Sequence, residues 1–302
     1  MILHSTGVIQ QFLCKFASMD SSLYRQLYAA AAPLFPDGQW KRYRRLVQDG
    51  IGRGAYGTDS HGVSTLERCV RAGIVLIGKT GLKKPSLLTA LFMPMVQQGL
   101  IGPEEYAKDF DDDTRRLMNC MQRVLQLYSQ HDSIADENFR KLLVSFAEDV
   151  RVIICLIADR YVLMKMLADA GQKCITCQIS NSRMVTKIRN ADGSWTYNYS
   201  IFDKWVQMMM DCGITGQIDC YGVVPWDISF DYVDKAPGAS RTVTDGPGTQ
   251  GFEDYWTPFL TDFKKHLEEK GWFDRTYLAF DERPEDSLLK TFQYLKKVAP
   301  EF

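Results

Sequence analysis

The hydrophobic pattern of this chain changes near residue 171, and this change restricts the folds that the chain can adopt. Before residue 171, apolar residues recur with the period of an α-helix. Turn residues at 36–38, 50–57, 81–85 and 99–103 separate the helical stretches. The pattern therefore predicts an all-α bundle in the N-terminal half. Two of the apolar stripes are Leu23, Leu27, Ala30 and Ala31, and Leu117, Met121, Val124, Leu125 and Tyr128.

After residue 171, short strand patterns alternate with longer helical patterns. Strands that alternate with helices are typical of a parallel sheet, because a crossover segment must carry the chain back to the edge where the next strand starts. We therefore predict an α-helical N-terminal part followed by an α/β part of about three βα units. The strands are expected at residues 173–179, 216–221 and 276–280, and the helices at residues 202–212, 252–270 and 285–298.

The join between the two halves lies in a continuous helical pattern over residues 158–168 and not in a flexible linker. We place the domain boundary inside this helix and predict domains at residues 1–163 and 164–302. An alternative concerns residues 150–157, which are β-branched enough to form a strand.

The composition indicates a globular chain without a strongly charged surface. It has 302 residues, 45% of them apolar, and a net charge of −1. Basic residues are dispersed except at residues 41–45, so the sequence predicts no nucleic-acid partner. Because no stretch approaches about 18 apolar residues and the first residues lack the start of a secretory signal, we expect no membrane partner and a cytoplasmic location. Cys174 and Cys177 face opposite sides of a strand, so we expect no metal or redox cofactor.

The strand pattern at residues 276–280 ends in two adjacent acids, Asp281 and Glu282, followed by Arg283 and Pro284. Neighbouring side chains at a strand end point in different directions, so one carboxyl group can act on a leaving group while the other holds another part of the substrate. Two carboxyl groups in two environments are typical of glycoside hydrolysis. The alternative is structural: Asp281 caps the next helix, whose first turn holds further acids.

Three aromatic residues and two acids in or after the strand at 216–221 are candidates for a sugar-binding site. Aromatic rings stack on the apolar faces of pyranose rings, and carboxyl groups bind sugar hydroxyls, but each of these side chains could equally serve in a core or a buried network. The connection over residues 224–251 is too long for an ordinary βα loop and is expected to shape a pocket. The candidates are Tyr221, Trp226 and Tyr232 as aromatics and Asp219 and Asp227 as acids.

Three segments of the N-terminal half carry a family resemblance: residues 137–143, 145–154 and 158–160. They resemble the helical HD-type hydrolase domain of the bifunctional (p)ppGpp synthetase/hydrolase family, and the likeness covers about residues 35–163. In that family a His, a His-Asp pair and a later Asp, on separate helices, hold a metal ion that activates water.

The metal ligands of that family are mostly absent from this chain. Asp159 matches the later Asp, but Met93 and Pro94 stand where the His-Asp pair is expected, and His61 has no clear counterpart. The resemblance therefore implies a degenerate HD domain in which nucleotide hydrolysis is lost. The alternative role of Asp159 is an ion pair with Arg160 on the same helix.

Several segments of the C-terminal half carry a second family resemblance: residues 167–173, 201–205, 217–221, 225–226, 256–260, 269–273 and 281–284. From about residue 164 onward, the chain resembles glycoside hydrolase family 123. The resemblance implies a (β/α)8-type barrel that acts on β-linked N-acetylgalactosaminides with retention of configuration. It also implies substrate-assisted catalysis, in which the sugar's own 2-acetamido oxygen is the nucleophile, Glu282 protonates the glycosidic oxygen and Asp281 stabilises the acetamido group.

A closed barrel of this type needs eight strands, whereas the sequence offers about three βα units. The resemblance therefore implies a TIM-barrel fragment, whose open sheet edges favour self-association. Our hypothesis is a chimera of a degenerate HD-like domain and a truncated glycoside hydrolase, with a carbohydrate substrate and with activity limited by the incomplete barrel. One alternative is a catalytically dead HD module that regulates or binds other proteins. Another is a split enzyme completed by a partner or a second copy.

Overall fold

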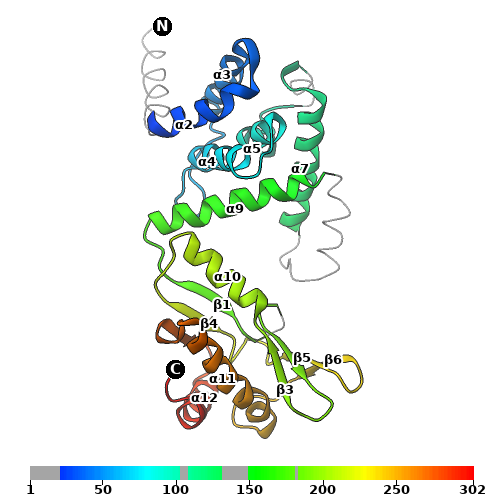
Figure 1. The fold of residues 1–302 in the computed structure, drawn as a ribbon, viewed down its shortest axis with the longest axis vertical. Helices are drawn as coiled ribbons and strands as arrows, with labels where there is room; N and C mark the ends of the chain where they lie inside the picture. Colours follow the sequence, from blue (N-terminus) through cyan, green and yellow to red (C-terminus); the bar gives the residue numbers. More distant parts are fainter. Residues whose placement is uncertain (1–20, 103–107, 131–148, 181–182) are drawn as a thin grey trace. The chain divides into compact units, whose positions relative to one another are not determined.

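The computed structural model describes residues 21–102, 108–130, 149–180 and 183–302 (Figure 1). The chain divides into two compact units, Met1–Leu167 and Ala168–Phe302, and each is described by itself. The division falls within helix α9, which spans Arg151–Asp169. Residues 137–143 and 145–148, which carry part of the predicted HD resemblance, lie outside the described residues.

The regular elements of the N-terminal unit are helices within its described residues, as the sequence predicts, and an isolated β-bridge joins Thr58 and Ser64. The alternative strand over residues 150–157 is wrong, because Val152, Cys155 and Ala158 are buried at helical spacing on one face of α9. In the ranges that the structure describes, no helix is long and apolar enough to cross a membrane. The helices are α2 (Ser21–Ala31), η1 (Ala32–Leu34), η2 (Pro36–Gly38), α3 (Gln39–Gly52), α4 (Thr65–Gly78), α5 (Lys84–Gln97), α7 (Asp112–Gln130) and α9.

Helix α5 forms the centre of this unit. Leu87, Leu88 and Phe92 are fully buried, and the helix is apolar on nearly all sides, as expected for a helix surrounded by others. It packs against α4 and α7 (Figure 1). The close contact with α4 requires Gly73, where a Cβ atom would lie 2.6 Å from Cδ1 of Leu87. Each fully buried side chain of this size contributes roughly 1.5–3 kcal/mol, so α5 is the energetic core of the unit.

The C-terminal unit contains the predicted parallel sheet. Its three strands have the order β1-β4-β7, and all neighbours are parallel. This confirms the alternating strand and helix pattern. The strands are β1 (Ile175–Gln178), β4 (Ile218–Tyr221) and β7 (Thr276–Ala279), and the helices are α10 (Ser200–Asp211), α11 (Gln250–Lys270), η3 (Phe273–Arg275) and α12 (Glu285–Val298).

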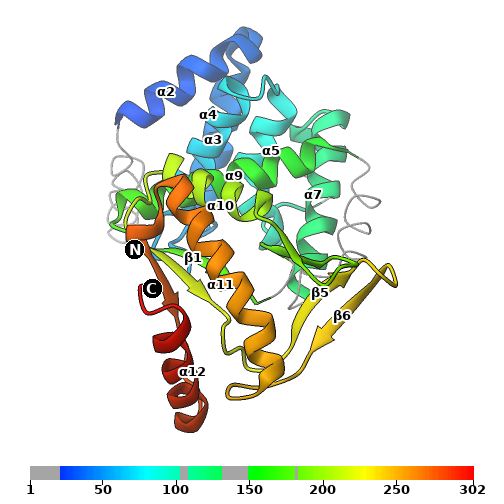
Figure 2. The same ribbon diagram turned by 60° about the horizontal axis from the view of Figure 1, so that its bottom comes forward.

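A second sheet, which the sequence analysis did not predict, is built from the connections that follow β1 and β4. It has four strands in the order β3-β2-β5-β6, and helix α11 packs against β3 and β6 (Figure 2). The expected loop over residues 224–251 therefore contains a hairpin. The barrel fragment is not confirmed, because both sheets are small and no barrel closes within the described residues. The strands are β2 (Thr186–Arg189), β3 (Trp195–Asn198), β5 (Phe230–Asp234) and β6 (Ala239–Val243).

The two faces of the parallel sheet differ in burial. Ile218 and Cys220 of β4 are completely buried, whereas the alternating residues Asp219 and Tyr221 are only half-buried. On the same face as Asp219, its β7 neighbour Tyr277 is 51% exposed. Parallel sheets are usually covered on both faces, so this sheet has one packed face and one partly open face.

Candidate functional site

Asp281 and Glu282 follow strand β7 at the carboxyl end of the parallel sheet, and both are exposed. Asp281 is held by two hydrogen bonds. Its Oδ1 accepts the backbone N–H of Glu282 at 2.8 Å, and its Oδ2 accepts the indole N–H of Trp226 at 3.0 Å. These two bonds, the backbone bond first, and the charge of Arg283 lower the pKa of Asp281. Asp281 is therefore ionised at neutral pH.

Arg283 fixes the segment that carries the two acids. Its side chain is 8% exposed, and its Nη1 lies 3.5 Å from Oδ2 of Asp281. Its Nε donates to the carbonyl of Val224 at 2.6 Å, and its guanidinium lies 4.1 Å from the ring centroid of Trp226. Sequence reasoning did not single out Arg283 as a site residue, although its position directly after the two acids was a usable signal.

Glu282 contributes only its backbone to this arrangement: its N–H donates to Asp281 and its carbonyl accepts from Arg283. Within the described residues its carboxyl group has no hydrogen bond or ion pair. The alternative in which Asp281 caps the next helix is wrong, because Pro284 occupies the cap position of α12 and no side chain caps that helix. One acid is thus oriented and the other is free to meet a ligand.

The predicted sugar-binding residues are only partly brought together. Trp226 is 68% exposed and contacts Asp281. Tyr221 ends β4 beside Ala279 of β7, one strand away from the acidic segment. Asp227 is exposed, and its side chain has no hydrogen bond within the described residues.

Asp219 lies toward the opposite end of the parallel sheet from the two acids. Its carboxylate accepts two hydrogen bonds from Gln217 Nε2, at 2.9 and 3.2 Å, and Gln217 precedes β4. Burial and the nearby Asp219 carboxylate raise the pKa of Cys174, which precedes β1. Both neighbours of Asp219 therefore lie at the amino ends of strands, whereas Asp281 follows a carboxyl end.

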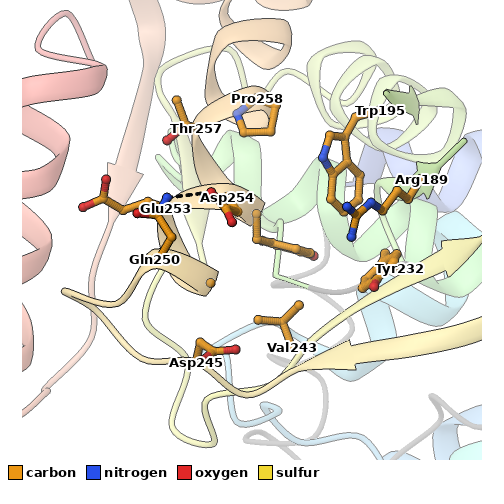
Figure 3. Close-up of a pocket in the computed structure, with 12 residues that line it drawn as sticks. Arg189, Trp195, Tyr232, Val243, Asp245, Gln250, Glu253, Asp254, Thr257 and Pro258 are labelled. Carbon is orange, nitrogen blue, oxygen red and sulfur yellow. Dashed lines mark hydrogen bonds between the residues drawn. The ribbon is translucent and has the colours of Figure 1, made fainter. Parts of the chain in front are cut away.

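The sequence analysis placed Tyr232 in a loop, but it lies within strand β5. There it lines a pocket of about 560 Å³ (Figure 3). The pocket lies between the four-stranded sheet and the first turns of helix α11. No hydrogen bond, ion pair or ring contact joins its lining residues to Asp281 or Glu282 in the part of the chain that the structure describes. Its lining includes Arg189, Trp195, Tyr232, Asp245, Gln250 and Asp254.

In the N-terminal unit, Asp159 of α9 is paired with Arg68 of α4. The Arg68 Nε lies 3.0 Å from Oδ1 of Asp159, although the angle is not that of a hydrogen bond. The ion pair expected with Arg160 is therefore replaced by one between two helices. Burial raises the pKa of Asp159, and the charges of Arg68 and Arg160 offset only part of this shift.

The same guanidinium also binds Asp59, in the turn before α4. Arg68 Nη1 donates to Oδ2 of Asp59 at 2.5 Å, and Oδ1 of Asp59 accepts the backbone N–H groups of His61 and Val63 at 2.9 and 3.0 Å. Burial alone would raise the pKa of Asp59, but these bonds and the Arg68 charge lower it. Arg68 thus forms an ion pair with each of the two acids.

This arrangement does not fit the metal ion that an HD domain implies. Met93 is buried and Pro94 lies inside helix α5, so neither supplies a charged ligand where the His-Asp pair is expected. Among the described residues, no group of three or more His, Cys, Asp or Glu side chains is arranged to hold a metal ion. Because Arg68 already places a positive charge beside Asp159, we assign no chemical step to a metal here.

Two families of domains match this chain. Residues 159–302 match the catalytic domain of glycoside hydrolase 123, and residues 54–194 match an HD domain. The two matches overlap at residues 159–194, which include the second half of α9. The chain is therefore chimeric: a region similar to an HD domain continues into a region similar to the glycoside hydrolase 123 catalytic domain. Both resemblances noted in the sequence are confirmed.

Two individual proteins are similar to parts of this chain. A GTP pyrophosphokinase from Myxococcus xanthus is 29% identical over 97 residues, which are 30% of this chain and 13% of that protein. The solved structure of a family 123 glycoside hydrolase from Clostridium perfringens, which was determined to describe glycolipid glycan hydrolysis, is 31% identical, with a TM-score of 0.44. That match covers 47% of this chain and 28% of the other. The chain thus spans a small part of each relative.

Proposed function

We propose that the C-terminal unit binds β-linked N-acetylhexosaminides and acts on them through Asp281 and Glu282. The unit is glycoside hydrolase-like, and the observation that supports this specific chemistry is the contrast between the two acids. Asp281 is held in its ionised form by Trp226 and a backbone N–H, whereas the Glu282 carboxyl group has no partner within the described residues. Substrate-assisted hydrolysis uses one fixed carboxylate and one proton donor.

The roles follow from the family resemblance. The substrate's 2-acetamido oxygen attacks the anomeric carbon while Glu282 donates a proton to the departing glycosidic oxygen. The acetamido nitrogen gains positive charge in this step, and the ionised Asp281 stabilises it. Glu282, now a carboxylate, takes a proton from the water that opens the cyclic intermediate. Arg283 acts as a positioning residue, because its bond to Val224 anchors the acidic segment.

The openness of the site limits the expected rate. Asp281 and Glu282 are exposed, and strands β1 and β7 are the two edges of a three-stranded sheet. Catalysis depends on positioning the reacting groups within a fraction of an ångström and on excluding water, so we expect slow hydrolysis by a single chain. A partner or a second copy that adds strands at β1 or β7 would raise the rate.

The test is hydrolysis of an aryl β-N-acetylgalactosaminide, measured on each peak from size-exclusion chromatography with light scattering. We expect Glu282→Gln to lower the rate by about 100-fold or more, the usual loss for a proton donor. The matched control is Glu285→Gln, an acid in the first turn of α12, which should retain the rate. Equal rates in Glu282→Gln and the unchanged chain would contradict the proposal.

For the N-terminal unit we propose a helical module that does not hydrolyse nucleotides. The observation that favours this role is the Arg68 guanidinium beside Asp159. We expect no release of pyrophosphate when the full chain is incubated with guanosine tetraphosphate and Mn²⁺. Release that disappears in Asp159→Asn would overturn this role. Nucleotide binding without release, lost on substitutions in residues 21–102, would support a regulatory module.

A further inference from the structure

The four-stranded sheet presents one face to helix α11. Arg189 of β2 pairs in register with Trp195 of β3, and Tyr197, two residues farther along β3, points to the same side. Tyr197 contacts Phe259 of α11, with ring centroids 5.4 Å apart. At Arg189 and Trp195 the sheet and the helix leave the pocket of about 560 Å³ (Figure 3). This volume lies in the range of pockets that hold small molecules.

The sheet side of the pocket carries hydrogen-bond donors without partners. Figure 3 shows Arg189, Trp195 and Tyr232 together on this side. Within the described residues, the Arg189 guanidinium, the Trp195 indole N–H and the Tyr232 hydroxyl form no hydrogen bond or ion pair. The rings of Trp195 and Tyr232 pack edge to face, with centroids 5.2 Å apart. This packing holds their donor groups in place on one side of the pocket.

The opposite side carries acceptors. Asp254 of α11 accepts a hydrogen bond from Gln250 Nε2 at 2.7 Å through one oxygen, which leaves its second oxygen open (Figure 3). Asp245 forms no ion pair in the part of the chain described here. Its carboxyl group fits against the first turn of α11 because residue 251 is glycine: a Cβ there would lie 2.6 Å from Cγ of Asp245.

We propose that this pocket binds a saccharide, at a site separate from Asp281 and Glu282 and independent of hydrolysis. A sugar hydroxyl both donates and accepts, so a single ring satisfies the donors on the sheet and the carboxylates on α11. Three acids and one arginine line the pocket, an arrangement that disfavours an anion. A metal ion or an ammonium group would satisfy the acids alone and would leave Arg189, Trp195 and Tyr232 unpaired.

The chain itself contains a reporter for each site. It has six tryptophans. The Trp195 indole lines the pocket, and the Trp226 indole donates to Asp281. We would label the full chain with ¹⁵N-tryptophan, assign the two signals with Trp195→Phe and Trp226→Phe, and titrate methyl β-galactoside and methyl β-N-acetylgalactosaminide. We expect the Trp195 signal to shift, with a dissociation constant on the order of millimolar because the pocket is open.

A pair of variants tests whether the shift reports the pocket. Arg189→Gln should weaken the Trp195 response by about tenfold, as for a lost hydrogen bond to a charged group. Arg241→Gln, an exposed arginine on β6 that does not line the pocket, should leave it unchanged. A Trp195 response that is equal in both variants would overturn the proposal.

The two reporters also separate this site from the proposed catalytic one. If the Trp226 signal shifts and the Trp195 signal does not, the pocket proposal is wrong and the catalytic proposal stands. If the Trp195 signal shifts alone, the pocket is a saccharide site and the acids do not bind these sugars. If neither signal shifts, the pocket proposal is overturned and the carbohydrate function loses support as well.

Discussion

Both units contain ion pairs, but particular charged side chains in them differ in whether they have a partner. In the N-terminal unit, Arg68 pairs with both Asp59 and Asp159. In the C-terminal unit, Glu282 and the fully buried Lys187 form no ion pair within the described residues. A charge with a built-in partner holds the structure together, whereas a charge without one is available to a ligand or has a shifted pKa. The difference indicates where chemistry remains possible in this chimeric chain.

Lys187 offers the largest test of this contrast. Its Nζ donates to the carbonyl of Ile179 at 2.6 Å and lies 4.7–5.8 Å from the ring centroids of Phe259, Tyr255 and Trp256. Burial lowers the pKa of Lys187 from 10.5 to about 7, and the charge of Asp231 offsets only part of this shift.

Between these two pKa values the unfolded chain binds a proton that the folded chain does not. The free energy of unfolding should therefore rise by about 1.4 kcal/mol per pH unit from pH 7 to 9 on account of Lys187. Lys187→Met should abolish this rise and should be most stabilising near pH 7. Urea unfolding followed by tryptophan fluorescence measures the effect, since five of the six tryptophans lie in residues 168–302.

The control for this prediction is Lys265→Met, because the Lys265 side chain is 75% exposed on the same helix that covers Lys187. It should leave the pH dependence intact. A slope that is the same in Lys187→Met as in the unchanged chain would show that the buried amine is protonated, and the contrast between the two units would then fail.

Arg68→Met should destabilise the N-terminal unit by roughly 2 kcal/mol. Removing the cation of a fully buried pair costs about 3–5 kcal/mol, and the Arg68 side chain is 21% exposed, so part of that cost is screened. Hydrogen exchange in α4 and α9 measures the loss locally. Arg71→Met removes an exposed pair with Glu67 on the same helix and should cost under about 0.5 kcal/mol. Equal losses in the two variants would contradict the structural role of Arg68.

The sequence predicted the parallel sheet because each of its strands is apolar and is followed by a long helical pattern. It did not predict the four-stranded sheet, whose strands are runs of four or five residues; two of these runs, β2 and β6, show no regular alternation of polar and apolar side chains. Signals were nevertheless present: Asp192-Gly193 and Pro237-Gly238 each lie between two such runs, which is a hairpin pattern. The second hairpin was missed because the whole of residues 224–251 was interpreted as one long loop.

The site was predictable only where it is local in sequence. Asp281 and Glu282 could be placed at a strand end because the strand directly precedes them. The partner of Asp159 could not be predicted. Sequence reasoning pointed to the adjacent Arg160, whereas in the structure Arg68 of α4 lies beside Asp159 of α9. Contacts of this kind depend on tertiary structure, which no periodicity in a single helix encodes.

Asp59 and Asp159, the two acids paired with Arg68, should contribute different amounts to the stability of the N-terminal unit. Asp59 accepts two backbone N–H groups in addition to Arg68, whereas the environment of Asp159 favours its neutral form. We expect Asp59→Asn to cost about 1–2 kcal/mol and Asp159→Asn less than about 1 kcal/mol, measured by hydrogen exchange in α4 and α9.

The pH dependence of these two acids should also have opposite signs. The pKa of Asp59 is lowered, so its contribution to stability is present above pH 3.8 and is lost as the pH falls through its folded-state pKa. The pKa of Asp159 is raised, so its contribution is lost as the pH rises through its folded-state pKa. If Asp159→Asn proved the more damaging variant, Asp159 and not Asp59 would be the principal partner of Arg68.

The smallest expected effect is a change in the pKa of Asp281, in the candidate site of the C-terminal unit. Trp226→Phe removes the indole N–H that Asp281 Oδ2 accepts and should raise the pKa of Asp281 toward its ordinary value. Because Asp281 is exposed and keeps its bond from the Glu282 N–H, the shift should be modest; a ¹³C carboxyl titration by NMR measures it. Trp205→Phe, which removes an indole bond to the carbonyl of Thr176, is the matched control. An unchanged pKa in Trp226→Phe would mean that Trp226 does not hold Asp281 in its ionised form, and the bond from the Glu282 N–H would then be the one that orients Asp281.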